Sequence, residues 1–150
     1  MSIAQLEMVA ELESNKEQKC LRDFQLAQQH VQNNKQKLTG LEQYRLDYLR
    51  QAQAKAKQGM AATSYGQHQQ FIGKLDKACE QQTKVVSNAL LVAEQRRQQW
   101  LNQQKKRKAV EMLLAKQRKA IDFKMAKQDQ QMLDELALQR FVRKEPNYKF

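Results

Sequence analysis

Gln58-Gly-Met-Ala-Ala-Thr-Ser-Tyr-Gly-Gln67 is the one stretch of this chain in which a helix-stop signal is followed at once by helix-start signals. Gly59 suits the left-handed residue that caps a helix C-terminus, because glycine has no Cβ to clash in that conformation. Ser64 followed by Gln67 fits a capping box at the start of a new helix, and Thr63 is an equally good N-cap. A short break between two long helical segments is typical of the turn of an antiparallel helical hairpin.

The remainder of the chain has the composition of long helices. Its 150 residues include four glycines and one proline, with 41% hydrophobic and 29% charged residues. Alanine, leucine, glutamine, lysine, arginine and glutamate dominate, and all of them favour helix. Disorder fits less well, because the apolar residues recur at helical spacing. We predict a single coiled-coil hairpin with a helix over 3–58, a turn over 59–64, a helix over 65–143 and a short tail over 144–150.

Each predicted helix carries a stripe at 3-4 spacing, and Ser2 with Gln5 offers a capping box at the start of the first helix. The stripe of the first helix is Cys20, Phe24, Ala27, Val31, Asn34, Leu38, Leu41, Arg45, Tyr48 and Ala52. The stripe of the second is Ile72, Leu75, Cys79, Gln82, Val86, Ala89, Ala93, Arg96, Trp100, Gln103, Arg107, Val110, Leu114, Gln117 and Ile121. Two such stripes pack as a coiled coil, and their polar members fix the register at a cost in stability. The fold class is therefore all-α, a long antiparallel two-helix coiled-coil hairpin with a C-terminal helical overhang.

The overhang follows from the unequal lengths of the two helices. A hairpin centred near residue 62 places position i opposite about 124 − i, so residue 3 faces about residue 121. The helix beyond Ile121 then has no internal partner, although it still carries Phe123, Met125, Met132, Leu133, Leu136, Leu138 and Phe141. Apolar residues on such a helix usually indicate an external partner. The alternative is a segment that is frayed in isolation, and folding on binding would reconcile the two.

The positive charge is concentrated in one stretch of the second helix. The whole chain has a net charge of +11, and residues 96–119 hold nine basic residues against Glu111 alone. These are Arg96, Arg97, Lys105, Lys106, Arg107, Lys108, Lys116, Arg118 and Lys119. Such a stretch attracts acidic proteins, nucleic acid or anionic lipid without choosing among them, and it is also typical of a solvated helix face.

The sequence predicts neither catalysis nor a cofactor. It has no phosphate-binding loop or dinucleotide glycine motif, and His30 and His68 lack metal-ligand neighbours. A two-helix fold also offers no concave site in which a titratable group is perturbed. Cys20 and Cys79 lie too far apart in the hairpin for a disulfide. With no signal peptide and no apolar run near the ~20 residues of a membrane span, we expect a cytoplasmic protein.

Aromatic residues gather on both sides of the predicted turn: Tyr44 and Tyr48 before it, Tyr65 and Phe71 after it. The pairing rule places Tyr48 opposite about residue 76 and Tyr44 opposite about residue 80, so Leu41, Tyr44, Tyr48, Phe71, Leu75 and Ala78 form one neighbourhood. Tyr48 and Leu75 fit the seam. Tyr44 and Phe71 lie one position off it, and we expect them to project as a docking site.

Four motifs carry a resemblance to a known family: Tyr44-Arg-Leu-Asp-Tyr48, Gln70-Phe-Ile-Gly-Lys-Leu-Asp-Lys-Ala78, Trp100, and Asp129-Gln-Gln-Met-Leu-Asp-Glu-Leu136. In their order and spacing they resemble the bacterial flagellar export protein FliJ over nearly the whole chain. The resemblance implies a non-enzymatic stalk and adaptor, similar to the coiled coil of the rotary ATPase γ subunit. Its implied partners are the hexameric export ATPase, the cytoplasmic linker of the export-gate membrane protein and substrate-specific export chaperones, at the inner membrane of the flagellar base.

The family's gate-contacting positions correspond to Leu41, Tyr44, Tyr48, Phe71, Leu75 and Ala78, and two further polar contact positions correspond to Lys37 and Gln82. The resemblance assigns the overhang, with Met132 and Leu136, to the ATPase-facing end. We expect Arg96, Arg97, Lys105, Lys106, Arg107 and Lys108 to contribute to ATPase binding through charge. The resemblance implies no small-molecule substrate.

Three alternatives stay open at the level of sequence. The basic stretch also fits a helical hairpin that binds nucleic acid, although aromatic stacking residues are not interleaved with its charge beyond Trp100. A virulence-type secretion stalk protein shares the architecture, and the flagellar assignment rests on the motif near the turn. A structural coiled-coil spacer is the third alternative, and it does not require the aromatic group.

Overall fold

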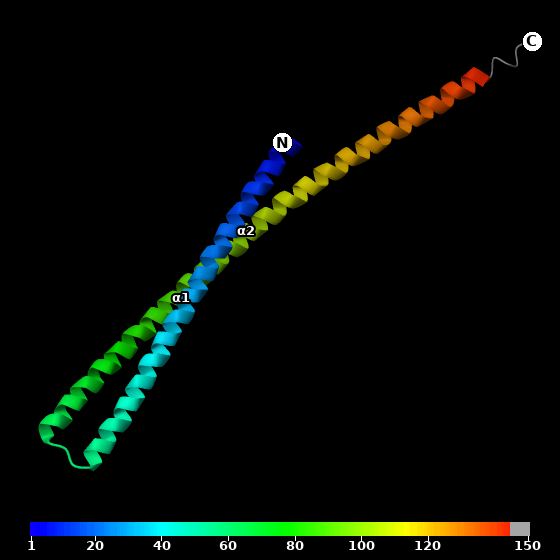
Figure 1. The fold of residues 1–150 in the computed structure, drawn as a ribbon. Coiled ribbons are helices and arrows are strands. Elements are labelled where there is room, and N and C mark those ends of the chain that lie inside the picture. The colour runs from blue at the N-terminus through cyan, green and yellow to red at the C-terminus, as the bar shows by residue number, and fades with distance from the viewer. Residues whose placement is uncertain (145–150) are drawn as a thin grey trace, which may run out of the picture. The chain divides into compact units, whose positions relative to one another are not determined.

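The computed structural model describes residues 1–144 and confirms the all-α helical hairpin. Helix α1 spans Ile3–Lys57 and helix α2 spans Ala62–Lys144, and the described residues include no strand (Figure 1). The tail expected beyond Lys144, with its Pro146, lies outside the described residues.

Local sequence explains where α1 begins and ends. The Ser2 backbone N–H donates to Gln5 Oε1 at 3.0 Å and the Gln5 N–H donates to Ser2 Oγ at 3.2 Å, which confirms the capping box. At the other end Gly59 has a φ of 95°, the left-handed conformation expected of it. Its N–H donates to the carbonyl of Ala56 at 3.2 Å, so the last turn of α1 closes at this glycine.

Helix α2 begins earlier than the sequence predicts. The Tyr65 N–H donates to the carbonyl of Ala61 at 3.1 Å, so Thr63 and Ser64 lie in the first helical turn and do not cap it. Alanine is the strongest helix former, and Ala62 extends the helix backwards at no cost in side-chain entropy. Only residues 58–61 then connect the two helices, a length typical of helical hairpins.

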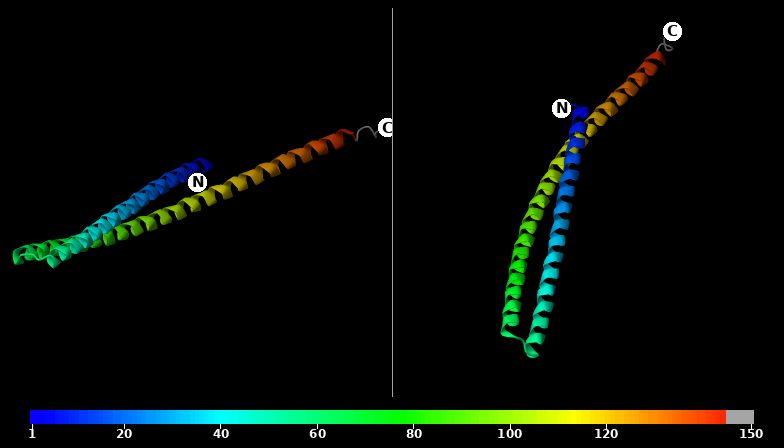
Figure 2. Two further views of the ribbon diagram at one scale, coloured as in Figure 1. Left: turned by 60° about the horizontal axis from the view of Figure 1, so that its bottom comes forward. Right: turned by 60° about the vertical axis from the view of Figure 1, so that its left-hand side comes forward.

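The chain divides into two units, which we describe separately. The hairpin unit comprises Lys16–Gln103 and contains the turn. Inside it α1 and α2 pack side by side as antiparallel neighbours (Figures 1 and 2). Val31, Ala89 and Ala93 form the core, with Ala27 packed against them. The small alanines allow the two helices to approach closely at this point.

A polar pair lies inside the seam of the hairpin unit. Gln82 Nε2 donates to both the backbone carbonyl and the Oδ1 of Asn34, each at 3.0 Å, across the two helices. Asn34 is buried, and its own Nδ2 donates to the His30 carbonyl at 2.8 Å. Because these buried groups satisfy each other only in one alignment, they fix the register, as expected for polar seam residues.

The terminal unit comprises Met1–Asn15 and the residues from Gln104 onward. Leu6 and Leu114 are its buried apolar residues. Arg118 pairs with Glu7 at 3.1 Å, which holds the first turns of α1 beside α2. Beyond Gln117 every residue of α2 up to Lys144 is exposed.

The burial pattern confirms both predicted stripes. Each stripe residue of α1 from Cys20 to Ala52, and each of α2 from Ile72 to Gln117, is buried or half-buried. Ile121 is the exception, because it is 43% exposed. Burial along α2 therefore ends about one helical turn before the sequence predicts.

The pairing rule is wrong near the turn. Tyr48 contacts His68 and Phe71, and Arg45 is the residue that pairs with Asp76. The cause is the shorter turn, whose centre lies closer to the N-terminus than residue 62. Further out the outcome is mixed. Phe24 stacks on Trp100, the residue that the rule places opposite it, with ring centroids 5.8 Å apart. Asn34, however, bonds to Gln82 and not to a residue near position 90.

We predict that replacing the seam pair by leucine stabilises the protein while loosening its register. Exchanging two hydrogen-bonded partners for apolar side chains is neutral or favourable, and we expect Asn34→Leu with Gln82→Leu to raise the free energy of unfolding by about 1 kcal/mol. Thermal melting followed by circular dichroism measures this change. Gln29→Leu with Lys84→Leu, at exposed positions of the same helices, is the matched control. A double seam variant that melts below both the wild type and this control would contradict the assignment.

Candidate functional site

The candidate site is an aromatic cluster of Tyr44, Tyr48, His68 and Phe71, close to the turn of the hairpin unit. The Tyr44 and Phe71 rings meet edge to face, with centroids 6.4 Å apart and an interplanar angle of 87°. The Tyr48 and Phe71 rings are tilted, with centroids 4.7 Å apart. Phe71 thus lies between two tyrosines of the opposite helix, in geometries that aromatic pairs favour.

Exposure separates the roles of these rings. Tyr44 is 53% exposed, as expected, and Leu75, four residues after Phe71 on α2, is buried. Phe71 is half-buried, so less of this ring is open to a partner than of Tyr44. The shifted register explains this, because it brings Phe71 beside Tyr48 as well as Tyr44. Tyr44 is therefore the ring most available to a partner.

The remaining residues of the predicted site lie around this cluster. Leu41 and Ala78 are half-buried, one helical turn from Tyr44 on α1 and from Leu75 on α2. Lys37 is exposed. Gln82 is half-buried and its amide nitrogen donates to Asn34, so its role in this structure is in the seam between the helices.

Two polar interactions that the sequence analysis did not predict hold the cluster in place. Arg45 pairs with Asp76 across the helices, and the Tyr48 hydroxyl hydrogen-bonds to His68 Nδ1. His68 precedes Phe71 by three residues, the spacing of neighbours on one helix face, and this spacing is the signal that could have identified it. His68 thus packs against Tyr48 near the turn.

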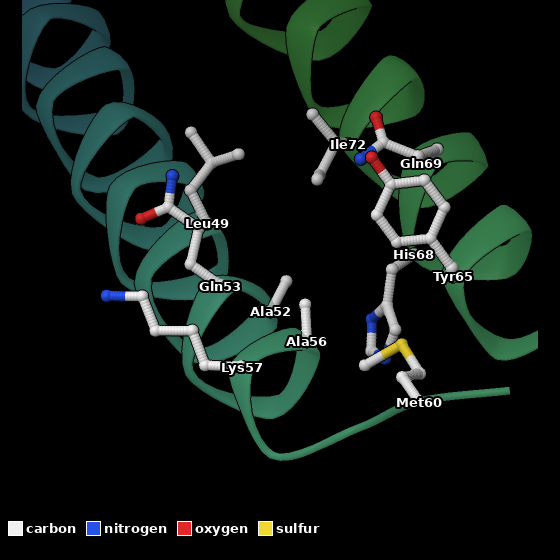
Figure 3. Close-up of a pocket in the computed structure, with 10 residues that line it drawn as sticks. All are labelled: Leu49, Ala52, Gln53, Ala56, Lys57, Met60, Tyr65, His68, Gln69 and Ile72. Carbon is white, nitrogen blue, oxygen red and sulfur yellow. The ribbon is translucent and has the colours of Figure 1, made fainter. Parts of the chain in front are cut away.

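A pocket of about 560 Å³ lies between the last turns of α1 and the first turns of α2. Figure 3 shows Leu49, Ala52 and Ala56 on α1 facing His68 and Ile72 on α2, with Met60 of the connecting segment at one end. Beyond Leu49 the α1 residues that face α2 here are alanines, whose side chains are too short to fill the space between the helices. Sequence patterning did not predict it.

The basic residues differ in their surroundings. In the hairpin unit Arg97 pairs with Glu94 at 3.2 Å, and Arg96 donates to Gln99 Oε1 at 3.2 Å. In the terminal unit Arg107 pairs with Glu111 at 2.7 Å, whereas Lys105, Lys106 and Lys108 are exposed. The three lysines are therefore the cations most available to an acidic partner.

Trp100 has a structural role. It is half-buried and stacks on Phe24 with an interplanar angle of 20°. Its indole N–H is buried and has no hydrogen-bond partner within residues 1–144. A ring engaged in this way is not free to stack on a nucleic-acid base, which weakens the nucleic-acid hypothesis.

The overhang of the terminal unit presents apolar side chains to solvent. Met132 and Leu136, four residues apart and therefore on one face of α2, are 63% and 50% exposed. Phe123, Met125, Leu133, Leu138 and Phe141 are exposed as well. A helix with this much exposed apolar surface has the character of a binding segment.

Between residues 1 and 144 no three histidine, cysteine, aspartate or glutamate side chains come together as metal ligands. Cys20 and Cys79 are free and half-buried. Over the same residues neither helix has a stretch long and apolar enough to cross a bilayer.

The fold and the cluster define an antiparallel coiled-coil hairpin whose exposed features lie beside its turn and on its C-terminal extension. A family model described as flagellar FliJ protein matches residues 1–146, so the chain belongs to the FliJ family. No curated protein and no solved structure matches the sequence.

Family membership defines the general role of the protein. It is a component of the flagellar export apparatus, in a family that is non-enzymatic. Membership implies a cytoplasmic protein at the flagellar base that interacts with other export components.

We predict that truncating the two rings of the cluster has different effects on stability. Phe71→Ala removes a half-buried ring between two tyrosines and should lower the free energy of unfolding by about 2 kcal/mol, below the range for a fully buried ring. Tyr44→Ala should lower it by less than about 1 kcal/mol, because more than half of that ring is already in water. Thermal melting of both variants measures the difference. Equal losses would show that Tyr44 belongs to the core.

Proposed function

We propose that this protein is the stalk and adaptor of flagellar type III export, which joins the hexameric export ATPase to the export-gate membrane protein. The observation that carries the proposal is the exposed Tyr44 ring, which meets Phe71 of the opposite helix edge to face. The chain that carries this ring belongs to a family of export components. A pre-positioned, partly exposed aromatic is a common anchor of protein interfaces.

The gate contact is assigned to Leu41, Tyr44, Tyr48, Phe71, Leu75 and Ala78. Tyr44 contacts the partner directly in this proposal, and Phe71 and Tyr48 hold its ring at a fixed angle. The Arg45–Asp76 pair ties the two helices together beside these rings. Because the site is already ordered, little conformational entropy is lost when the cytoplasmic linker of the gate binds.

The ATPase contact is assigned to the overhang and the basic stretch. Met132 and Leu136 supply exposed apolar surface, and Lys105, Lys106 and Lys108 supply charge. Arg96, Arg97 and Arg107 keep their positive charge while bonded to neighbours on the same helix. Apolar contacts of this kind give affinity, and the charges accelerate encounter with an acidic surface.

Escort of substrate-specific export chaperones and peripheral association with the inner membrane rest on family membership alone. The family match favours the flagellar role over a virulence-type secretion stalk protein. The Phe24–Trp100 stack favours it over nucleic-acid binding.

We predict that Tyr44→Ala weakens binding to the cytoplasmic linker of the gate at least tenfold, because the variant loses an interface anchor. Binding to the export ATPase should not change, since that contact is assigned to other residues. Two separate binding assays with the purified partners measure these effects. Leu46→Ala is the matched control, since Leu46 is also exposed on α1 but two residues away and so on another face. Equal losses for Tyr44→Ala and Leu46→Ala would refute the gate assignment.

We predict that reversing Lys105, Lys106 and Lys108 to glutamate weakens ATPase binding and flattens its dependence on salt. The wild-type interaction should weaken steeply as ionic strength rises, because exposed charges are screened. Reversal of Lys74, Lys77 and Lys84 changes the net charge equally on the same helix and is the control. Tight, salt-sensitive DNA binding without ATPase binding would support the nucleic-acid alternative instead.

A further inference from the structure

The pocket beside the turn is a second feature of the hairpin unit that none of the roles above uses. Its volume of about 560 Å³ exceeds what one missing side chain leaves, and its walls are formed mainly by Leu49, Ala52, Ala56, Met60 and Ile72. His68, Gln53 and Gln69 add polar groups to the lining. A concave apolar space with a few polar groups has the usual composition of a binding site.

The charge around this pocket has one sign. Residues 48–75 contain four basic residues, Arg50, Lys55, Lys57 and Lys74, and no acidic residue. Lys57 lines the pocket itself, and Lys55 lines the adjoining hollow at the turn. The field over this part of the hairpin is therefore positive and attracts a partner that carries negative charge.

We infer that this pocket receives an apolar side chain from an acidic peptide segment of a partner protein. The anchor side chain enters between Ala56 and Ile72, where it leaves water for an apolar wall. Carboxylates that flank the anchor lie near Lys55 and Lys57, and Gln53 or Gln69 can bond to the backbone of the segment. Apolar burial supplies affinity, and the charges select an acidic sequence.

A membrane surface fits the same positive charge less well. An interfacial anchor presents large apolar side chains outward, so that they enter the lipid. The connecting residues 58–61 present none, because Met60 is half-buried and its neighbours are glutamine, glycine and alanine. The apolar surface here is concave and lies between two helices, so a single inserted side chain reaches it and a flat bilayer does not.

This site is separate from the aromatic cluster and does not depend on the proposed gate contact. Ala52 and Ala56 lie on the last two turns of α1, beyond Tyr48, and Tyr44 does not line the pocket. The two sites therefore respond to different substitutions. Tyr44→Ala should leave peptide binding at the pocket unchanged, whatever its effect on the gate.

The test is a titration of the full-length protein, labelled at its alanine, methionine and isoleucine methyl groups, with a synthetic peptide. The peptide carries a leucine pair flanked by glutamates. We expect the methyl signals of Ala52, Ala56, Met60 and Ile72 to shift together and saturably, while that of Ala54, exposed on another face, stays in place. A peptide with serine in place of leucine, and one with lysine in place of glutamate, are the matched probes.

Two variants check the pocket from the protein side. Ala56→Phe fills it and should weaken the peptide at least tenfold, whereas Ala54→Phe adds the same ring elsewhere and should have no effect. Lys57→Glu changes only an exposed charge, so it tests the electrostatic contribution even if a larger ring perturbs the turn. It should weaken the glutamate peptide about threefold or more, with helicity unchanged by circular dichroism.

Each other outcome overturns the inference. Equal binding of the leucine and serine peptides would show attraction by charge alone. Shifts confined to methyl groups outside the pocket, or no shift at all, would show that the pocket is not a site. Sedimentation with anionic phospholipid vesicles that is lost in Lys57→Glu, without peptide binding, would assign this surface to a membrane.

Discussion

Two helices can remove only one narrow stripe of each from water, and everything else in this protein follows from that constraint. A globular domain surrounds its core with several elements, whereas each helix here has a single neighbour. The buried cluster of Val31, Ala89 and Ala93 therefore has only three members, and large apolar side chains such as Leu91 stay in solvent. Stability comes from a long succession of small contacts along the seam. Surfaces that bind partners must therefore lie on the exposed sides of the helices or beyond the end of the seam.

Such a seam is easily shifted along its length, because alanine and valine contacts look alike from one turn to the next. The buried Asn34 and the half-buried Gln82 remove this freedom by bonding to each other across the helices. The register they fix places Phe71 between Tyr44 and Tyr48. Without polar residues in the seam, the two helices could pack in several registers, and only one of them would give this arrangement of rings. The polar pair therefore fixes the geometry of the exposed Tyr44 ring by fixing the register.

The chain has three different surfaces that could contact partners. The aromatic cluster presents a ring in a fixed geometry, the pocket presents a concave apolar space under positive charge, and the overhang presents apolar side chains on a helix with no neighbour. These differences suit different partners, since a fixed ring favours a matching groove and an exposed apolar helix favours a larger enclosing surface. The proposed role as an adaptor between export components would use such a division.

The sequence by itself determined the helical hairpin, its seam and its overhang. Every residue that periodicity assigned to the seam from Cys20 to Ala52 is buried or half-buried, because burial in a coiled coil depends on spacing along one helix. The Ser2 and Gln5 cap and the left-handed Gly59 were likewise local and predictable. The candidate residues near the turn were identified from the motif order and the family resemblance. The half-burial of Phe71 could not be predicted from either.

Only the tertiary structure decided what meets across the seam. Sequence placed Tyr48 opposite Asp76, but the turn is shorter than its capping signals predict, and Arg45 occupies that position. An error of a few residues in the turn moves every nearby contact between the helices by about one helical turn. For the same reason the Tyr48–His68 bond and the pocket beside Ala52 and Ala56 were not visible in the sequence. Each depends on the distance and alignment of two helices, which no pattern within either helix contains.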